Sequence, residues 1–200
     1  MSDKRVNGLS PDELRAAIER FRANPELAKF KFRASHAWID GAHGRSTIKS
    51  FYGAGQEDNT RTAAFELEVD EPNILFGQNL APNATETLLH GLASCLGGAF
   101  VFYASARGVA IDSLRLALEG DVDLRGFLGI SDEVRPGLQN IRVVFEVESS
   151  APRDQIEELV QLAQRYSPVF DSVSHGLPVT VRLAGQKPAP VEREPPPMQP

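Results

Sequence analysis

The residue in this sequence best equipped for chemistry is Cys95, the only cysteine among 200 residues. A thiolate is a soft nucleophile that can attack a peroxide or a disulfide. Because there is only one cysteine, the chain cannot form an internal disulfide, a zinc site of several cysteines or a CxxC redox pair. The histidines, His36, His43, His90 and His175, are scattered without the spacing of metal ligands. We therefore expect no metal site and no cofactor.

Cys95 lies in an apolar stretch that we expect to form one long helix over residues 84–107, with Gly108 suited to its C-terminal cap. At 100° per residue, the face that carries Cys95 also carries small and apolar residues, namely Leu88, Gly91, Leu92, Gly98, Ala99 and Phe102. Glycine inside a helix costs about 1 kcal/mol relative to alanine. The glycines therefore predict that another helix, a partner chain or a ligand approaches this backbone closely.

The residue types alone leave two interpretations of Cys95 open. A single cysteine in an apolar helix is commonly a small core residue, and the middle of a helix gains nothing from the helix dipole. A reactive thiolate would need a cation from elsewhere in the fold. His90 lies about 140° and Glu86 about 180° around the wheel from Cys95, so neither points at the sulfur. We expect Glu86 to favour the first helical turn and to pair with His90.

The hydrophobic pattern predicts helices and strands that do not alternate regularly, which indicates an α+β fold rather than a βαβ series. The expected order is a helix over 11–23, strands over 30–39, 46–51 and 61–69, the long helix, strands around 114–118 and 141–147, a helix from Pro152 that Pro168 stops or bends, and a closing strand with Val179, Val181 and Leu183. A loop or short helix is expected between the two middle strands.

Charge and composition narrow the range of partners. A net charge of -6 argues against a nucleic-acid binder and against a protein of anionic membrane surfaces. Residues 87–106 carry no formal charge and approach the length that spans a bilayer, but His90 and the glycines favour a buried central helix. The polar N-terminus predicts a cytoplasmic protein. From Lys187 onward the chain is rich in proline, and we expect it to be disordered.

The run GQNLAPNATETLLHGLASC, from Gly77 to Cys95, resembles the OsmC/Ohr family of peroxide-reducing proteins. Later segments are similar to the family as well: Arg107-Gly108, Leu118–Asp121, Arg135–Ile141, Ser167-Pro168-Val169 and Leu177-Pro178-Val179. The resemblance covers residues 30–184. It leaves residues 1–29 as an N-terminal helical extension and residues 185–200 as a disordered proline-rich tail.

The resemblance implies an OsmC-like fold in which two long helices pack with antiparallel sheets in an intertwined homodimer, with two sites at the subunit interface. Cys95 matches the cysteine that attacks the peroxide. Arg45 is the best match for an arginine that stabilises its thiolate, and Glu86 approximately matches a glutamate that holds this arginine. Phe102 and Tyr103 would line a pocket that suits an organic hydroperoxide. An arginine stays cationic at any relevant pH, so it could stabilise a cysteine thiolate placed beside it.

Ser167 departs from the family pattern, because the family's second cysteine falls at this position. A serine hydroxyl cannot condense with a sulfenic acid to form a disulfide. Either an external thiol reduces the oxidised Cys95, or the protein no longer turns over peroxide. The sequence therefore predicts a one-cysteine, thiol-dependent peroxidase. The alternatives are a non-catalytic domain that binds or senses a small apolar molecule and a domain that mainly serves dimer assembly.

Overall fold

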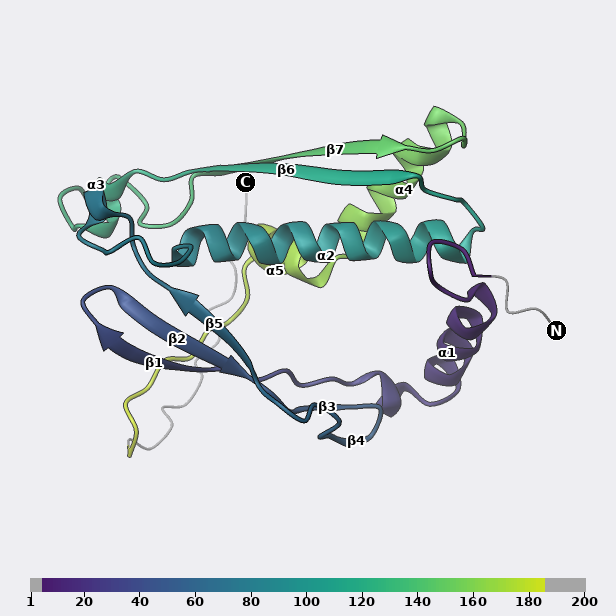
Figure 1. Cartoon of the computed structure of the whole chain (residues 1–200), viewed down its shortest axis with the longest axis horizontal. Coiled ribbons are helices and arrows are strands. Elements are labelled where there is room, and N and C mark those ends of the chain that lie inside the picture. Colours follow the sequence, from purple (N-terminus) through teal and green to yellow (C-terminus); the bar gives the residue numbers. More distant parts are fainter. Residues whose placement is uncertain (1–4, 186–200) are drawn as a thin grey trace, which may run out of the picture.

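A computed structural model describes residues 5–185 and has the mixed α+β architecture expected from the sequence. The helices are α1 (Pro11–Ala23), α2 (Ala84–Ala106), α3 (Leu124–Phe127), α4 (Arg153–Tyr166) and α5 (Pro168–His175), with the short 3-10 turns η1 (Pro25–Ala28) and η2 (Asn73–Leu75). The strands are β1 (Ser35–Asp40), β2 (His43–Ile48), β3 (Phe51–Gly53), β4 (Gln56–Asp58), β5 (Phe65–Val69), β6 (Ser113–Asp121) and β7 (Asn140–Glu148). Figure 1 shows two layers, which α1 joins at one end and the segment between β5 and α2 joins at the other. The expected disordered tail lies, from residue 186 onward, outside the described residues.

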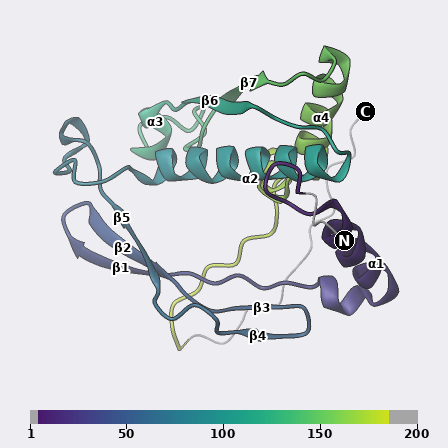
Figure 2. The same ribbon diagram turned by 45° about the vertical axis from the view of Figure 1, so that its right-hand side comes forward.

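The first layer is built around α2. Its buried side chains recur every fourth residue, at Leu92, Leu96, Phe100 and Ala104, so they form one stripe along the helix. The antiparallel hairpin of β6 and β7 covers this stripe with alternate side chains such as Leu114 and Phe145. Helix α4 completes the core with Leu159 and Ala163, and the views in Figures 1 and 2 agree that α4 and α5 lie beside α2.

Helix α2 is also, among the described residues, the one helix long and apolar enough to cross a membrane. The central helix of a soluble protein meets the same criterion. Its buried stripe packs against β6, β7 and α4, as expected for a core helix.

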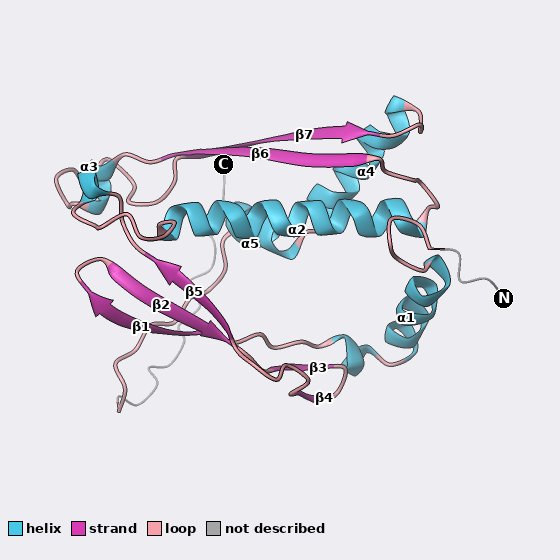
Figure 3. Ribbon diagram, viewed as in Figure 1, coloured by secondary structure: helices cyan, strands magenta, loops and turns pink. Residues whose placement is uncertain are grey.

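The second layer contains a three-stranded antiparallel sheet in the order β1–β2–β5 and a small hairpin of β3 and β4 (Figure 3). The register pairs Arg45 with Glu68 on one face of the three-stranded sheet, and Ser46 with Leu67 on the other. The second face also carries Trp38 and Phe65, which are 73% and 58% exposed. Within one chain this apolar sheet face therefore has little cover.

The segment before α1 is fixed to the end of α2. The Asn7 side chain donates hydrogen bonds to the Ser105 hydroxyl (3.2 Å) and to the Val109 carbonyl (2.9 Å), and it accepts one from the Ile111 amide (2.9 Å). Ser10 then caps α1 by accepting from Glu13. The N-terminal extension is therefore anchored to the turn that joins α2 to β6.

The structure confirms the long helix within one residue, the position of α1 and the two strands expected after the long helix, which are β6 and β7. Gly108 adopts the left-handed conformation expected after a helix. The expected closing strand is wrong for the single chain. Residues 177–183 form no strand, and Val181 is 89% exposed. A strand needs a ladder of hydrogen bonds to a neighbouring strand, and Val179 and Val181 belong to no sheet among the described residues. The β3–β4 hairpin was not expected, because each strand has only three residues.

Candidate functional site

The loop before α2 is held by a buried carboxylate. Asp70 is 1% exposed and accepts hydrogen bonds from the amides of Glu71 (2.8 Å), Gln78 (3.0 Å) and Leu80 (3.1 Å). Burial raises the pKa of Asp70, but these amides and the nearby His43 outweigh it, so the pKa of Asp70 lies below its usual value. Sequence analysis read this segment only as a loop and missed the role of Asp70.

The first turn of α2 contains Glu86, one of the expected site residues. Asn83 accepts a hydrogen bond from the Glu86 amide, and the Glu86 carboxylate accepts one from the Asn83 amide, both at 2.8 Å. This reciprocal pair is a capping box. It gives hydrogen-bond acceptors to two backbone amides at the start of the helix that have no acceptor within the helix. The expected preference of Glu86 for the first turn is confirmed. The expected interaction of Glu86 with His90 was wrong, because the Glu86 carboxylate instead accepts a hydrogen bond from the Asn83 amide.

Cys95 lies half-buried in the middle of α2, and its side chain forms a hydrogen bond with that of Ser167. The Ser167 hydroxyl donates to the Cys95 sulfur, with 3.1 Å between Oγ and Sγ. The two residues are 72 positions apart in sequence. They meet because α4 and α5 pack along α2, and Ser167 is the single residue between these two helices. The structure thus brings together Cys95 and the position at which the resemblance places the family's second cysteine.

Ser167 itself is fully buried and caps α5. Its hydroxyl oxygen accepts a hydrogen bond from the amide of Phe170 at 3.2 Å. Pro168 occupies the first helical position, where its missing N–H costs nothing. The expected effect of Pro168 is confirmed, because α4 stops two residues before it and α5 starts with it.

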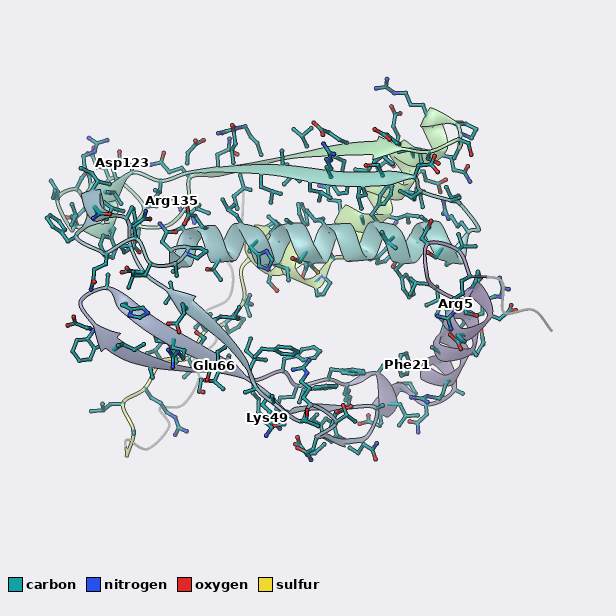
Figure 4. All side chains as sticks on the ribbon, viewed as in Figure 1. Arg5, Phe21, Lys49, Glu66, Asp123 and Arg135 are labelled. Carbon is teal, nitrogen blue, oxygen red and sulfur yellow. The ribbon has the colours of Figure 1, made fainter. Side chains whose placement is uncertain are left out.

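Arg45 lies in the other layer of the same chain. Its Nε donates to the Glu68 carboxylate at 2.6 Å, and Glu66 lies 3.9 Å away. The hydrogen bond with Glu68, together with the charges of both glutamates, raises the pKa of Arg45, while Arg45 and His43 lower that of Glu68. Figure 4 shows Glu66 on the β1–β2–β5 sheet, apart from α2. A single chain therefore does not join Arg45 to Cys95 or to Glu86.

The expected pocket residues Phe102 and Tyr103 follow Cys95 on α2 and contact each other edge to face. Tyr103 also packs on Tyr166, with 5.6 Å between ring centroids. Burial, with a smaller effect from Tyr166, raises the pKa of Tyr103. Since Tyr166 directly precedes Ser167, this aromatic pair lies on the C-terminal side of the Cys95–Ser167 contact.

On the other side of the contact is a groove that sequence analysis missed. It has a volume of about 550 Å³ and lies between the first half of α2, the start of β7 and α5. Its lining is mostly apolar and includes Leu88, Leu92, Ile141, Phe170 and Val173. Leu88 and Leu92 share the helical face of Cys95, although Cys95 itself is not among the residues that line the groove. The signal was present in the sequence, but the partners of Leu88 and Leu92 are set by packing.

Arg135 is the charged residue in the lining of this groove. Figure 4 shows it near the N-terminal end of α2. The sequence reasoning noted Arg135 only as part of a family-like segment. Its position gives the mostly apolar groove one cationic group.

The face of α2 that carries Cys95 is open at two glycines. A Cβ atom built on Gly91 or on Gly98 would meet no atom within 4 Å, whereas one on Gly97 would lie 3.6 Å from Leu116. The close approach that these glycines predict is therefore not made at Gly91 or Gly98 by the described part of the same chain.

Comparisons with known proteins find one family. The family model described as OsmC-like protein matches residues 77–182, which is more than half of the chain and includes both Cys95 and Ser167. No protein of curated function matches the sequence.

Solved structures with a similar fold come from several bacteria. An OsmC-like protein from Mycoplasma pneumoniae is 17% identical with a TM-score of 0.54, and the match covers 74% of this chain and 89% of that one. A protein from Psychrobacter arcticus, described as a candidate for osmotic stress and detoxification responses, is 14% identical with a TM-score of 0.53, over 70% and 85% of the two chains. The organic hydroperoxide resistance protein OhrB of Bacillus subtilis is 20% identical with a TM-score of 0.46, over 72% and 93%. At these identities, the first two matches show the fold alone.

Proposed function

The chain belongs to the OsmC-like protein family, and from this membership and the surroundings of Cys95 we propose that it reduces organic hydroperoxides through this one cysteine. The observation that carries the proposal is the 3.1 Å contact between the Cys95 sulfur and the Ser167 hydroxyl. The contact supports a site arranged like that of a two-cysteine peroxidase, in which a serine hydroxyl stands in the place of the second thiol. An external thiol therefore supplies the reducing equivalents.

The chemistry runs in three balanced steps. The Cys95 thiolate attacks the terminal oxygen of ROOH, the O–O bond breaks, and a cysteine sulfenic acid forms while the alkoxide takes a proton from water and leaves as ROH. A first external thiol attacks the sulfenic sulfur and releases water, which leaves a mixed disulfide. A second external thiol releases Cys95 and forms the small-molecule disulfide. The sum is ROOH plus two thiols giving ROH, a disulfide and water.

The groove between α2, β7 and α5 supports an organic substrate rather than hydrogen peroxide. Its apolar walls offer hydrophobic contact to an alkyl or aryl group, and hydrogen peroxide has no such group to bury. Phe102 and Tyr103 extend the apolar surface on the far side of Cys95. The bound peroxide then lies across the sulfur, with its organic part in the groove.

A second copy of the chain completes the site in this proposal. The apolar face of the β1–β2–β5 sheet and the open glycines of α2 support a homodimer in which these surfaces cover one another. The family resemblance, rather than this sheet face, assigns Arg45 of one copy to the thiolate of the other, since Arg45 lies on the opposite face of the sheet. A fixed guanidinium near sulfur favours the charged form. The homodimer is soluble and cytoplasmic, and it needs neither a nucleic acid nor a membrane.

The test replaces Cys95 and follows peroxide. The rate of cumene hydroperoxide consumption with excess dithiothreitol should fall to the buffer rate in Cys95→Ser. The matched control is Ser94→Ala, at the exposed neighbouring position, which should keep the wild-type rate. One equivalent of peroxide should add one oxygen to the wild-type mass. If Cys95→Ser and the wild type consume peroxide equally, the proposed function is wrong.

One observation favours a second candidate, a domain that binds a small apolar molecule without redox chemistry. Within residues 5–185, the Cys95 sulfur has no recorded cationic partner. For such a domain, Cys95→Ser would leave ligand affinity unchanged, and the native thiol would react slowly with disulfide reagents at neutral pH. The same peroxide assay, with wild-type protein inactive, would favour this candidate.

A further inference from the structure

The hydroxyl of Ser167 has a role beyond filling the place of a missing thiol. It is fully buried, and its oxygen takes part in two hydrogen bonds at once. The amide of Phe170 donates to the oxygen at 3.2 Å, and the hydroxyl donates toward the Cys95 sulfur at 3.1 Å. A hydroxyl has one hydrogen to donate, and here it is directed at sulfur.

The first of these bonds orients the second. Because the Phe170 amide uses a lone pair of the oxygen, the hydroxyl hydrogen must point away from that amide. The Cys95 sulfur is the recorded acceptor on that side. Helix α5 begins at the next residue and runs for eight residues, so its positive N-terminal end lies behind the hydroxyl.

We propose that Ser167 is a catalytic residue, whose hydroxyl stabilises the ionised sulfur of Cys95 by donating a hydrogen bond held in place by the start of α5. This inference rests on the proposed function for its catalytic meaning, but the hydrogen bond can be tested without any turnover. A hydrogen bond to a charged acceptor is stronger than one to a neutral acceptor, so this contact favours the thiolate over the thiol.

The role requires no covalent change in Ser167. The thiolate gives an electron pair to the terminal peroxide oxygen, and the alkoxide that leaves takes its proton from water. The serine proton stays on Oγ throughout. When the sulfur becomes a sulfenic acid it loses its negative charge, so the hydrogen bond weakens and releases the stabilisation that the thiolate had received.

The experiment titrates the thiolate directly by its absorbance near 240 nm. Cys95→Ser serves as the blank, which removes the contribution of the tyrosines. Ser167→Ala should move the midpoint of the Cys95 titration upward by about one pH unit or more, the size expected for one hydrogen bond to a charged group. An unchanged midpoint would overturn the inference.

The matched control is Ser10→Ala. Ser10 is also a buried serine before a proline, and it caps α1 by accepting from the amide three residues later, as Ser167 does for α5. Its loss should destabilise the chain to a similar extent and leave the titration unchanged. The charged and titratable side chains on α2, α4 and α5, together with Arg135 of the groove, are common to all these variants and affect their titrations alike. They are Glu86, His90, Tyr103, Arg135, Arg153, Asp154, Glu157, Glu158, Arg165, Tyr166, Asp171 and His175.

Two further variants keep the test decisive if Ser167→Ala does not fold. Ser167→Gly removes the hydroxyl but keeps a residue that is tolerated at helix N-caps, and it should show the same upward shift. Ser167→Thr keeps a hydroxyl and should restore the wild-type midpoint. A wild type that titrates as described but does not consume peroxide would end the proposed function and leave this hydrogen bond standing.

Discussion

At the scale of residues, the site depends on one contact between distant positions. Cys95 is a half-buried thiol on a helix, and nothing in its own helix makes it reactive. Ser167 adds a directed hydroxyl from the junction of two other helices. The proposed chemistry therefore depends on the pair rather than on the cysteine alone, and each member of the pair can be substituted separately.

Restoring a thiol at the junction should restore an internal disulfide. In Ser167→Cys, a sulfur would replace an oxygen that now lies 3.1 Å from the Cys95 sulfur, so the two sulfur atoms are close enough to bond. One equivalent of peroxide should convert Cys95 to a sulfenic acid that condenses with the new thiol and releases water. A count of free thiols should fall from two to zero, and dithiothreitol should reverse it. Ser10→Cys, at the other buried Ser-Pro cap, should form no disulfide within the chain; two thiols persisting in Ser167→Cys would contradict the contact.

Arg45 should matter for turnover more than for folding. In one chain its partners are exposed glutamates on the same sheet, and such pairs contribute little to stability. Arg45→Ala should lower the rate of cumene hydroperoxide reduction by about tenfold or more while the thermal unfolding temperature changes little. Glu68→Ala breaks the same ion pair but keeps the guanidinium, so its rate should remain near wild type. Equal losses of rate in both variants would reduce Arg45 to a strand residue.

At the scale of elements, local rules predicted most helices, while strands depended on partners. The caps at Ser10 and at Gly108 and the proline at 168 are local signals, and the structure contains the expected helix ends there. Alternating residues such as Val179 and Val181 signal a strand but do not say which chain supplies its neighbour. The contact of Cys95 with Ser167 could be suggested only through the family resemblance, because periodicity relates residues within one helix. The helical wheel places Leu88 and Leu92 on one face of the helix, but the groove itself arises from packing between elements, which the wheel does not indicate.

The loop that leads into α2 should respond to acid through Asp70. The folded pKa of Asp70 lies below its unfolded value, so its contribution to stability is present above about pH 4 and is lost as pH falls through the folded pKa. Asp70→Asn should be less stable at pH 7, because its amide group would place N–H atoms against the donating amides of Gln78 or Leu80. Denaturant unfolding at pH 7 and at pH 3 should show a smaller pH effect in Asp70→Asn than in wild type. The exposed Asp132→Asn is the control and should keep the wild-type pH effect.

At the scale of the whole molecule, residues 5–185 of one chain leave apolar surfaces exposed. These include the apolar face of the β1–β2–β5 sheet, the Cys95 face of α2 at its open glycines, and the side chains of Val179 and Val181. Exposed apolar patches of this extent in a soluble protein commonly mark an interface. A second copy would cover an apolar sheet face with a helix face and offer Val179 and Val181 a strand to pair with, so the fold and the proposed catalysis would depend on the same association.

The glycines of α2 give this association a test in which the sign of the effect decides. If the chain acts alone, Gly98→Ala should raise the free energy of unfolding by about 1 kcal/mol, because the new Cβ meets nothing within 4 Å and alanine favours a helix. If a second copy packs closely on this face, the same methyl group clashes, and the dimer should weaken.

We expect wild-type protein to sediment as a dimer at micromolar concentration and Gly98→Ala to shift toward monomer with a lower rate of peroxide reduction. Gly97→Ala, whose Cβ would make an ordinary 3.6 Å contact with Leu116, should keep the wild-type mass. A wild-type monomer that reduces peroxide would show that Cys95 works without a partner chain. A Gly98→Ala dimer of higher stability would show that the second copy does not pack closely on this face of α2.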